Sequence, residues 1–452
     1  MARFLYSGNP ETSDEIIPGD DTCVISTRLS LVLQAGRNVN GWSFSRGAGY
    51  MAVKVQVKDG GVTAATGFVA GGVKAGIKAS GGADLALVYS ERPCSAAGTF
   101  TTNNVRASSV DWCENRLPSK SIRAVLCNSG CANACTGKRG ERDTASMAGA
   151  AAQVCGVDVD AVLVASTGVI GHFLPLDAIA KALPGLREQL TASGGRSFAE
   201  AIMTTDLAKK EAAVEVARGR VRYTIGGCTK GSGMICPDMA TMLGFITTDA
   251  AITPSRLNAI VKRVVDRTFN NLTVDGDTST NDMVLALANG ASGVRVTETA
   301  ALADFEEGLF AVCNDLCKQI AADGEGASKR VEIHVKGGAT EADAKLAARA
   351  VANSNLTKCA LFGNDPNWGR IACAVGYSKA KFSDRKMSIR LCGVPVFRNL
   401  QPLKFDHKTV HEALRQKVVT IDIDLGVGSA SAIAHTCDFS YDYVKINAEY
   451  HT

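Results

Sequence analysis

The alternation of two residue periods along most of the chain is the feature that most limits its fold. Short segments with apolar residues at every second position alternate with longer segments whose apolar residues recur every three or four positions. The clearest period-two segment, 418–425, places Val419, Ile421, Ile423 and Leu425 on one face. Because such strands need helices over their apolar faces, we expect an α/β fold of layered sheets covered by helices.

Several other elements can be placed from the same patterns. Further strands are expected at 85–89, 122–127, 161–165, 330–335 and 388–391. A helix is expected to begin after Thr253, with Pro254 as its first residue, and a second apolar stripe indicates a helix over 305–320. Residues 217–228 are charged and contain glycine, so we interpret them as a linker.

The composition argues against nucleic acid and membranes as partners. Lys and Arg number 49 and Asp and Glu 45, which leaves a net charge of only +4 with no long run of one sign. Aromatic residues make up 6% of the chain, too few to suggest a platform for stacked bases. No apolar run is long enough to span a bilayer, so chemistry on small molecules is the better expectation.

The cysteines indicate a reducing compartment rather than a disulfide framework or a metal site. The chain holds 15 cysteines but no Cys-x-x-Cys pair and no Cys/His cluster with zinc-finger spacing. Cys127, Cys131 and Cys135 recur every four residues among small neighbours, and we interpret them as packing residues. We therefore expect no metal and a location in the cytoplasm or the mitochondrial matrix rather than outside the cell.

The first 55 residues differ in composition from the rest of the chain, and we interpret them as an N-terminal extension. Residues 1–21 are polar and acidic, whereas 22–58 contain no acidic residue, several serines and five basic side chains. The second part has the composition of an organelle transit peptide, although the acidic opening does not, and Met51 is an alternative start.

One segment, 230–241, carries a candidate nucleophile. It reads Lys230-Gly-Ser-Gly-Met-Ile-Cys-Pro-Asp-Met-Ala-Thr241. A cut between Ala240 and Thr241 would leave a terminal threonine whose hydroxyl is a nucleophile and whose α-amine, with a pKa of about 8, is a base. The competing interpretation is a buried strand over 240–246 in which the threonine only packs.

Eight blocks in the same order support the first interpretation. Besides 230–250 they are Asn128-Ser-Gly-Cys-Ala-Asn-Ala-Cys-Thr136, Ser166-Thr-Gly-Val-Ile-Gly171, Met203-Thr-Thr-Asp206, Val274-Asp-Gly-Asp-Thr-Ser-Thr-Asn281, Asp323-Gly-Glu-Gly-Ala-Ser328, Asp365-Pro-Asn-Trp-Gly-Arg370 and Ile446-Asn-Ala-Glu-Tyr-His-Thr452. From about residue 62 to the end, the chain resembles the ornithine acetyltransferase (glutamate N-acetyltransferase) family of arginine biosynthesis. Asp238 and Cys131 stand where that family usually has asparagine.

The resemblance implies a self-cleaving acyltransferase of the N-terminal-nucleophile type. Cleavage between Ala240 and Thr241 would give an α chain, 56–240, and a β chain, 241–452. Thr241 would be the nucleophile, and Thr167 and Gly168 would donate a hydroxyl and an amide to the oxyanion, from the end of a strand that opens a helical turn. Taken alone, Ser166-Thr-Gly is only a turn or N-cap pattern.

The resemblance also implies a set of substrate-binding residues, namely Thr204 (or Thr205), Lys230, Thr241, Glu325, Asn447 and Thr452. Lys230 would meet substrate carboxylates and Glu325 the ornithine side-chain ammonium. Each has a plainer interpretation, such as a helix cap for the threonine at 204, a solvated lysine, an exposed turn carboxylate and a frayed C-terminus.

The implied reaction is a ping-pong transfer of acetyl from N-acetylornithine through Thr241 to glutamate, without a bound cofactor. Some relatives also use acetyl-CoA, and the sequence leaves that open for this chain. The implied assembly is a dimer of α/β pairs. Two other classes stay open, namely an N-terminal-nucleophile aminopeptidase or amidase, and an uncut binding protein.

Overall fold

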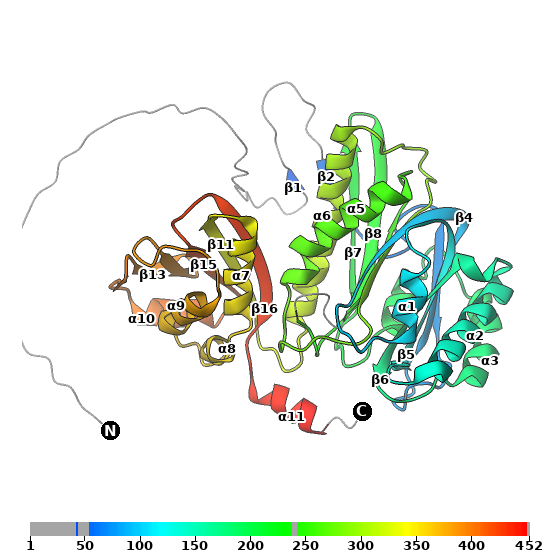
Figure 1. The fold of residues 1–452 in the computed structure, drawn as a ribbon, viewed down its shortest axis with the longest axis horizontal. Helices are drawn as coiled ribbons and strands as arrows, with labels where there is room; N and C mark the ends of the chain where they lie inside the picture. The colour runs from blue at the N-terminus through cyan, green and yellow to red at the C-terminus, as the bar shows by residue number, and fades with distance from the viewer. Residues whose placement is uncertain (1–41, 44–53, 237–241, 450–452) are drawn as a thin grey trace, which may run out of the picture. The chain divides into compact units, whose positions relative to one another are not determined.

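Two β-sheets carry the described part of the chain (Figure 1). The computed structural model describes residues 42–43, 54–236 and 242–449, which belong to one unit, Asn38–Thr452. The larger sheet contains β1 (Trp42–Ser43), β2 (Lys54–Lys58), β3 (Phe68–Val73), β4 (Leu85–Phe100), β5 (Ser119–Cys131), β6 (Val162–Val169), β7 (Lys210–Arg218), β8 (Val221–Lys230), β9 (Leu243–Thr248) and β10 (Met283–Ala288). Their order is β1-β2-β7-β8-β9-β10-β4-β5-β6, with β3 paired to β4.

The smaller sheet is built entirely from the C-terminal third of the chain. It contains β11 (Arg330–Gly338), β12 (Ser388–Leu391), β13 (Val394–Arg398), β14 (Gln401–Pro402), β15 (Val418–Asp424) and β16 (Ala430–Cys437), in the order β14-β13-β12-β15-β11-β16. The alternation predicted for 418–425 is confirmed, because all four inward residues of that segment are buried. Parallel pairing of Val331 with Val419 and of Ile333 with Ile421 aligns the buried rows of β11 and β15.

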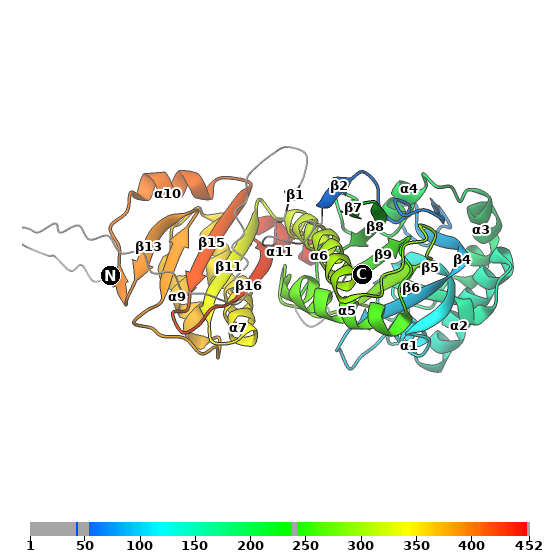
Figure 2. The same cartoon turned by 90° about the horizontal axis from the view of Figure 1, so that it is seen from above.

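Helices cover both sheets, as the sequence pattern predicts (Figure 2). They are α1 (Ser108–Glu114), α2 (Gly137–Cys155), α3 (Leu176–Glu188), α4 (Gly195–Ala201), α5 (Pro254–Arg267), α6 (Thr299–Ala322), α7 (Glu341–Ala352), α8 (Asn355–Phe362), α9 (Trp368–Tyr377), α10 (His407–Leu414) and α11 (Tyr441–Glu449), with 3₁₀ turns at Val159–Ala161 and Phe269–Asn271. Thr253 and Pro254 begin α5 as expected, although the Thr253 side chain makes no capping hydrogen bond.

The larger sheet has apolar residues on both faces. Consecutive residues of β9 and β10 belong to opposite layers, so that Ile246 and Val284 pack with α5 and α6 while Phe245 and Leu285 pack with α1 and α4. At the other end of the sheet, α2 and α3 cover β5 and β6. The fold is therefore α/β with sheets layered between helices, which confirms the fold class expected from the sequence.

The linker predicted at 217–228 is wrong, since these residues form the end of β7 and most of β8. Eight residues of β8, from Tyr223 onward, are buried between β7 and β9. Its glycines reflect close packing rather than flexibility, because a Cβ on Gly226 would lie 2.2 Å from the Gly61 carbonyl oxygen.

Candidate active site

Thr167 and Gly168 lie near the end of β6, where Thr167 is buried and Gly168 is half-buried. Gly130 and Gly168 are paired across β5 and β6, and Thr167 is 5% exposed. Gly168 has a φ of 128°, and a Cβ there would lie 2.3 Å from the Gly130 carbonyl carbon, so only glycine fits. The expected helical turn does not follow, because both residues still belong to the strand and the next helix, α3, begins at Leu176.

Lys230, the last residue of β8, reaches this strand end from the other half of the sheet. Its Nζ donates a hydrogen bond of 3.2 Å to the Thr167 Oγ1, and the residue is 4% exposed. Burial lowers the pKa of Lys230, and the carboxylates of Asp206 and Asp282 partly offset this effect. An ammonium group can only donate, so the Thr167 hydroxyl accepts from Lys230 and its own proton is free for another partner.

The candidate nucleophile and the scissile bond, Ala240–Thr241, lie outside the described residues, but both flanks of residues 237–241 are described. Upstream, the amides of Met234 and Ile235 donate to the Asp275 carboxylate at 2.6 and 2.9 Å. Downstream, the buried Met242 amide donates to Asp282 Oδ1 at 3.0 Å.

These two carboxylates are in different electrostatic surroundings. Burial raises the pKa of Asp275 to about 6, although the amide hydrogen bonds favour its charged form and partly oppose this shift. Burial raises the pKa of Asp282 well above its usual value, although nearby Lys230 opposes the shift.

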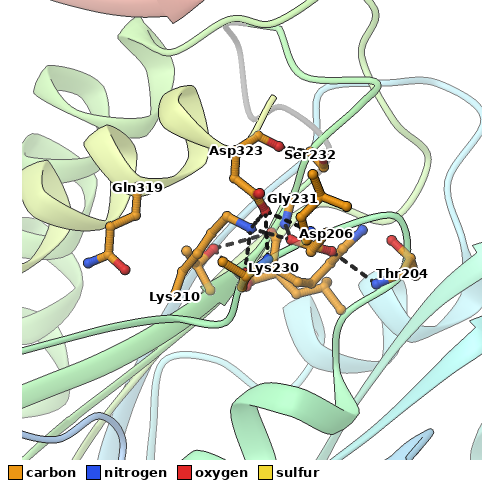
Figure 3. A network of polar contacts seen from close by, with 12 residues as sticks. Thr204, Asp206, Lys210, Lys230, Gly231, Ser232, Gln319 and Asp323 are labelled. Carbon is orange, nitrogen blue, oxygen red and sulfur yellow. Dashed lines mark hydrogen bonds and ion pairs between the residues drawn. The ribbon is translucent and has the colours of Figure 1, made fainter. Parts of the chain in front are cut away.

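A third carboxylate, Asp206, connects the Thr204 turn to the Lys230 segment (Figure 3). Asp206 Oδ2 accepts the Thr204 amide at 2.9 Å, while Oδ1 accepts the Gly231 amide at 2.7 Å and Lys210 Nζ at 2.6 Å. Burial alone would raise the pKa of Asp206, but the charges of Lys210 and Lys230 outweigh it and hold the pKa below its usual value. Thr204 caps no helix, since α4 ends at Ala201 and β7 begins at Lys210.

Glu325 follows α6 in the turn expected from the sequence and has defined partners. Asn447 Nδ2, on α11, donates to Glu325 Oε2 at 2.9 Å, and the Glu325 amide donates to the Ser232 carbonyl oxygen at 2.9 Å. Gly233 lies against the same carboxylate, because a Cβ built there would be 2.2 Å from Oε2. Thr452 lies outside the described residues.

The structure therefore brings the predicted residues into two pairs, Thr167 with Lys230 and Glu325 with Asn447. Residues 230–235 join the pairs, since one end of this segment contacts Thr167 and Asp206 and the middle contacts Glu325. Sequence reasoning missed Asp206, Asp275 and Asp282. Asp206 and Asp275 stand inside quoted sequence blocks and Asp282 directly follows one, which was the only available signal.

Comparison with known families decides the relationship. A model of the ArgJ family matches residues 69–452. The chain belongs to the ArgJ family. This confirms the resemblance expected from the sequence blocks, and it makes the chain an enzyme of arginine biosynthesis of the acyltransferase class.

Relatives within the ArgJ family match this chain over nearly their full length. The "arginine biosynthesis bifunctional protein ArgJ" of a Synechococcus species is 48% identical over 405 residues, which cover 87% of this chain and 98% of that protein. The chloroplastic ArgJ protein of Sorghum bicolor is 47% identical over 406 residues, with 87% and 88% covered. A solved ArgJ structure from Bacillus halodurans is 40% identical with a TM-score of 0.46 and covers 46% of this chain and 100% of that chain.

The names and organisms of the relatives bear on the location of the chain. They include bacterial proteins and plant proteins named chloroplastic, from Sorghum bicolor and Oryza sativa. The mitochondrial matrix expected as one option has no support among them. No helix in the described ranges combines the length and apolarity needed to cross a bilayer.

Proposed function

We propose that this ArgJ-family chain transfers the acetyl group of N2-acetylornithine to glutamate, after cutting itself between Ala240 and Thr241. The observation that carries the proposal is the contact between Lys230 Nζ and Thr167 Oγ1 at 3.2 Å, because it orients the Thr167 hydroxyl as a donor next to the end of β8. Lys230 of β8 pairs with Leu243 of β9. Thr241, the proposed nucleophile, precedes Leu243 by two residues in the sequence. The domain boundaries that we propose are 1–55, 56–240 and 241–452.

The chemistry would proceed in two acyl transfers. The Thr241 hydroxyl attacks the acetyl carbonyl carbon while the α-amine accepts its proton, and the oxyanion accepts hydrogen bonds from the Thr167 hydroxyl and the Gly168 amide. The C–N bond then breaks, the proton passes to the leaving amine, and ornithine departs from an acetyl-threonine ester. The glutamate amine attacks this ester by the reverse sequence, which releases N-acetylglutamate and restores Thr241.

The two halves of the chain would contribute different parts of the pocket. Thr204 and Lys230 come from the α chain, and Glu325, Asn447 and Thr452 come from the β chain. We assign Glu325 to the ornithine side-chain ammonium, which its charge and its hydrogen bond to Asn447 support. We also propose a dimer of α/β pairs in a reducing compartment, and acetyl-CoA as a second acetyl donor, which the word "bifunctional" in the relatives' names favours.

Release of ornithine tests the proposed function. Without glutamate, purified protein should release about one ornithine per site from N-acetylornithine, since only acylation of Thr241 can occur. Added glutamate should restart release and yield an equal amount of N-acetylglutamate. Continuous release without glutamate would instead identify an amidase, and no release at all would favour the binding protein.

Replacing Gly233 with alanine should weaken the use of N-acetylornithine by displacing the Glu325 carboxylate. The added Cβ would lie within 2.2–2.5 Å of three carboxylate atoms at the end of a flexible side chain, so the fold can adjust while the carboxylate moves. We expect KM for N-acetylornithine to rise about tenfold, because a hydrogen bond to a charged group contributes about 1.5–3 kcal/mol.

Steady-state kinetics in both directions checks this prediction. Glu325→Gln should give a similar change, whereas Gly149→Ala, in α2, should have none, because a Cβ at Gly149 meets no atom within 4 Å. An unchanged KM for N-acetylornithine in Gly233→Ala would contradict the assignment of Glu325.

A further inference from the structure

Lys210 is a buried cation that the proposed chemistry does not use. Its side chain is 1% exposed and its Nζ lies between two carboxylates, 2.6 Å from Asp206 Oδ1 and 2.5 Å from Asp323 Oδ2. A third hydrogen bond, of 3.1 Å, goes to the Ala208 carbonyl oxygen. A buried ammonium bound to two carboxylates holds them in one geometry, since removing the ammonium would leave two buried carboxylates without their shared cation.

The two carboxylates that bind Lys210 contact different sides of the candidate site. Asp206 binds the amides of Thr204 and Gly231, the residue after Lys230. Asp323 directly follows α6 and precedes Glu325 by two residues, and its Oδ2 also accepts the amides of Leu207 and Ala208.

Ser232, in the segment after Lys230, also contacts Asp323 and Glu325. Its Oγ donates to the Asp323 carbonyl oxygen at 2.6 Å, and its carbonyl oxygen accepts the Glu325 amide. Figure 3 shows Lys210 between the Asp206 turn and the end of α6.

A comparable ion pair lies at the opposite ends of the same two elements. Arg218 ends β7 and Asp304 lies near the start of α6, and their side chains are joined by two hydrogen bonds of 2.5 Å. Asp304 and Asp323 are similarly buried, with side chains 7% and 11% exposed. The Lys210 end of this β7–α6 pair contacts residues of the candidate site, whereas Asp304 forms its ion pair with Arg218 at the far end, so Asp304 is a natural control.

We propose that Lys210, by joining Asp206 to Asp323, is a positioning residue that fixes the separation between Glu325 and the Thr167–Lys230 pair, and so sets the length of the diamino acid that the site accepts. The inference rests on the proposed function. The acetyl carbonyl oxygen must lie at Thr167 and Gly168 while the side-chain ammonium reaches Glu325. A fixed separation between Glu325 and the Thr167–Lys230 pair then favours one side-chain length in the substrate. A variable separation would also accept a diamino acid with a longer side chain.

The test compares N2-acetylornithine with N2-acetyllysine, which has one more methylene. The wild-type enzyme should prefer acetylornithine in kcat/KM by roughly 10- to 200-fold, the usual range for one methylene. Asp323→Asn and Lys210→Met should reduce this preference about tenfold, mainly through KM for the two donors. Asp304→Asn should lower the melting temperature comparably but leave the preference for acetylornithine unchanged. If Lys210 acted only through stability, all three variants would have the same effect on this preference.

A second measurement reports the coupling without acetyl transfer. In Asp323→Asn, which leaves Lys210 paired with Asp206, hydrogen exchange at the Leu207, Ala208 and Glu325 amides should quicken by about tenfold or more. Unchanged exchange, or an unchanged preference in a folded variant, would overturn the inference even if Lys210→Met does not fold. A wild-type protein that transfers no acetyl group would contradict the proposed function, while the exchange rates would still decide whether Lys210 couples the two turns.

Discussion

Thr241→Ala is expected to leave a single uncut chain that transfers no acetyl group. Alanine keeps the backbone but has no hydroxyl, so neither the attack on the Ala240 carbonyl nor formation of the acetyl ester can occur. Loss of a nucleophile from a catalytic unit costs on the order of a millionfold in kcat, so residual turnover should fall below detection. Denaturing electrophoresis and the acetyl-transfer assay measure the two effects separately.

Two companion variants sharpen this prediction. Thr241→Ser keeps a hydroxyl and should retain part of both the cleavage and the transfer. Thr253→Ala removes a threonine whose side chain makes no capping hydrogen bond, and it should be cut and active like the wild type. Transfer by an intact Thr241→Ala chain would rule out this nucleophile.

Thr167→Ala should lower kcat by about 10²–10³, the cost of losing one oxyanion donor. The hydroxyl is held by Lys230 Nζ at 3.2 Å, so its proton is directed away from the ammonium and is available to the developing charge. Because the oxyanion exists only in the transition state, KM should change little.

Thr167→Ser is the matched control, since it retains the hydroxyl that Lys230 orients. It should keep most of the activity that Thr167→Ala loses. A kcat for Thr167→Ala within a few-fold of the wild-type value would show that Thr167 is not an oxyanion donor.

Much of the fold follows from patterns that are local in the sequence. The period-two pattern of 418–425 and the Thr253-Pro254 helix start depend on neighbours within a few residues, and both are confirmed. The strand β8 was missed because its glycines and charges resemble a linker. Its burial depends on β7, β9 and the Gly61 carbonyl oxygen, and only the assembled sheet brings these together.

The residues of the candidate site likewise include some that the sequence predicted and others that it did not. The family blocks pointed to Thr167 and Lys230, and the structure places their side chains in contact. Lys210 and Asp282 were assigned no role, because their positions depend on partners far along the chain, such as Asp323 for Lys210. Cys135 was predicted to pack among small residues and is exposed instead, in a left-handed conformation with a φ of 58° just before α2.

Mass spectrometry of the purified protein, incubated with N-acetylornithine but no glutamate, tests the central claim most directly. We predict two polypeptides, of which the C-terminal one begins at Thr241 and carries one acetyl group on that residue's hydroxyl, removable by added glutamate. A full-length active chain, or an active two-chain protein with no acetyl group on Thr241, would contradict the account.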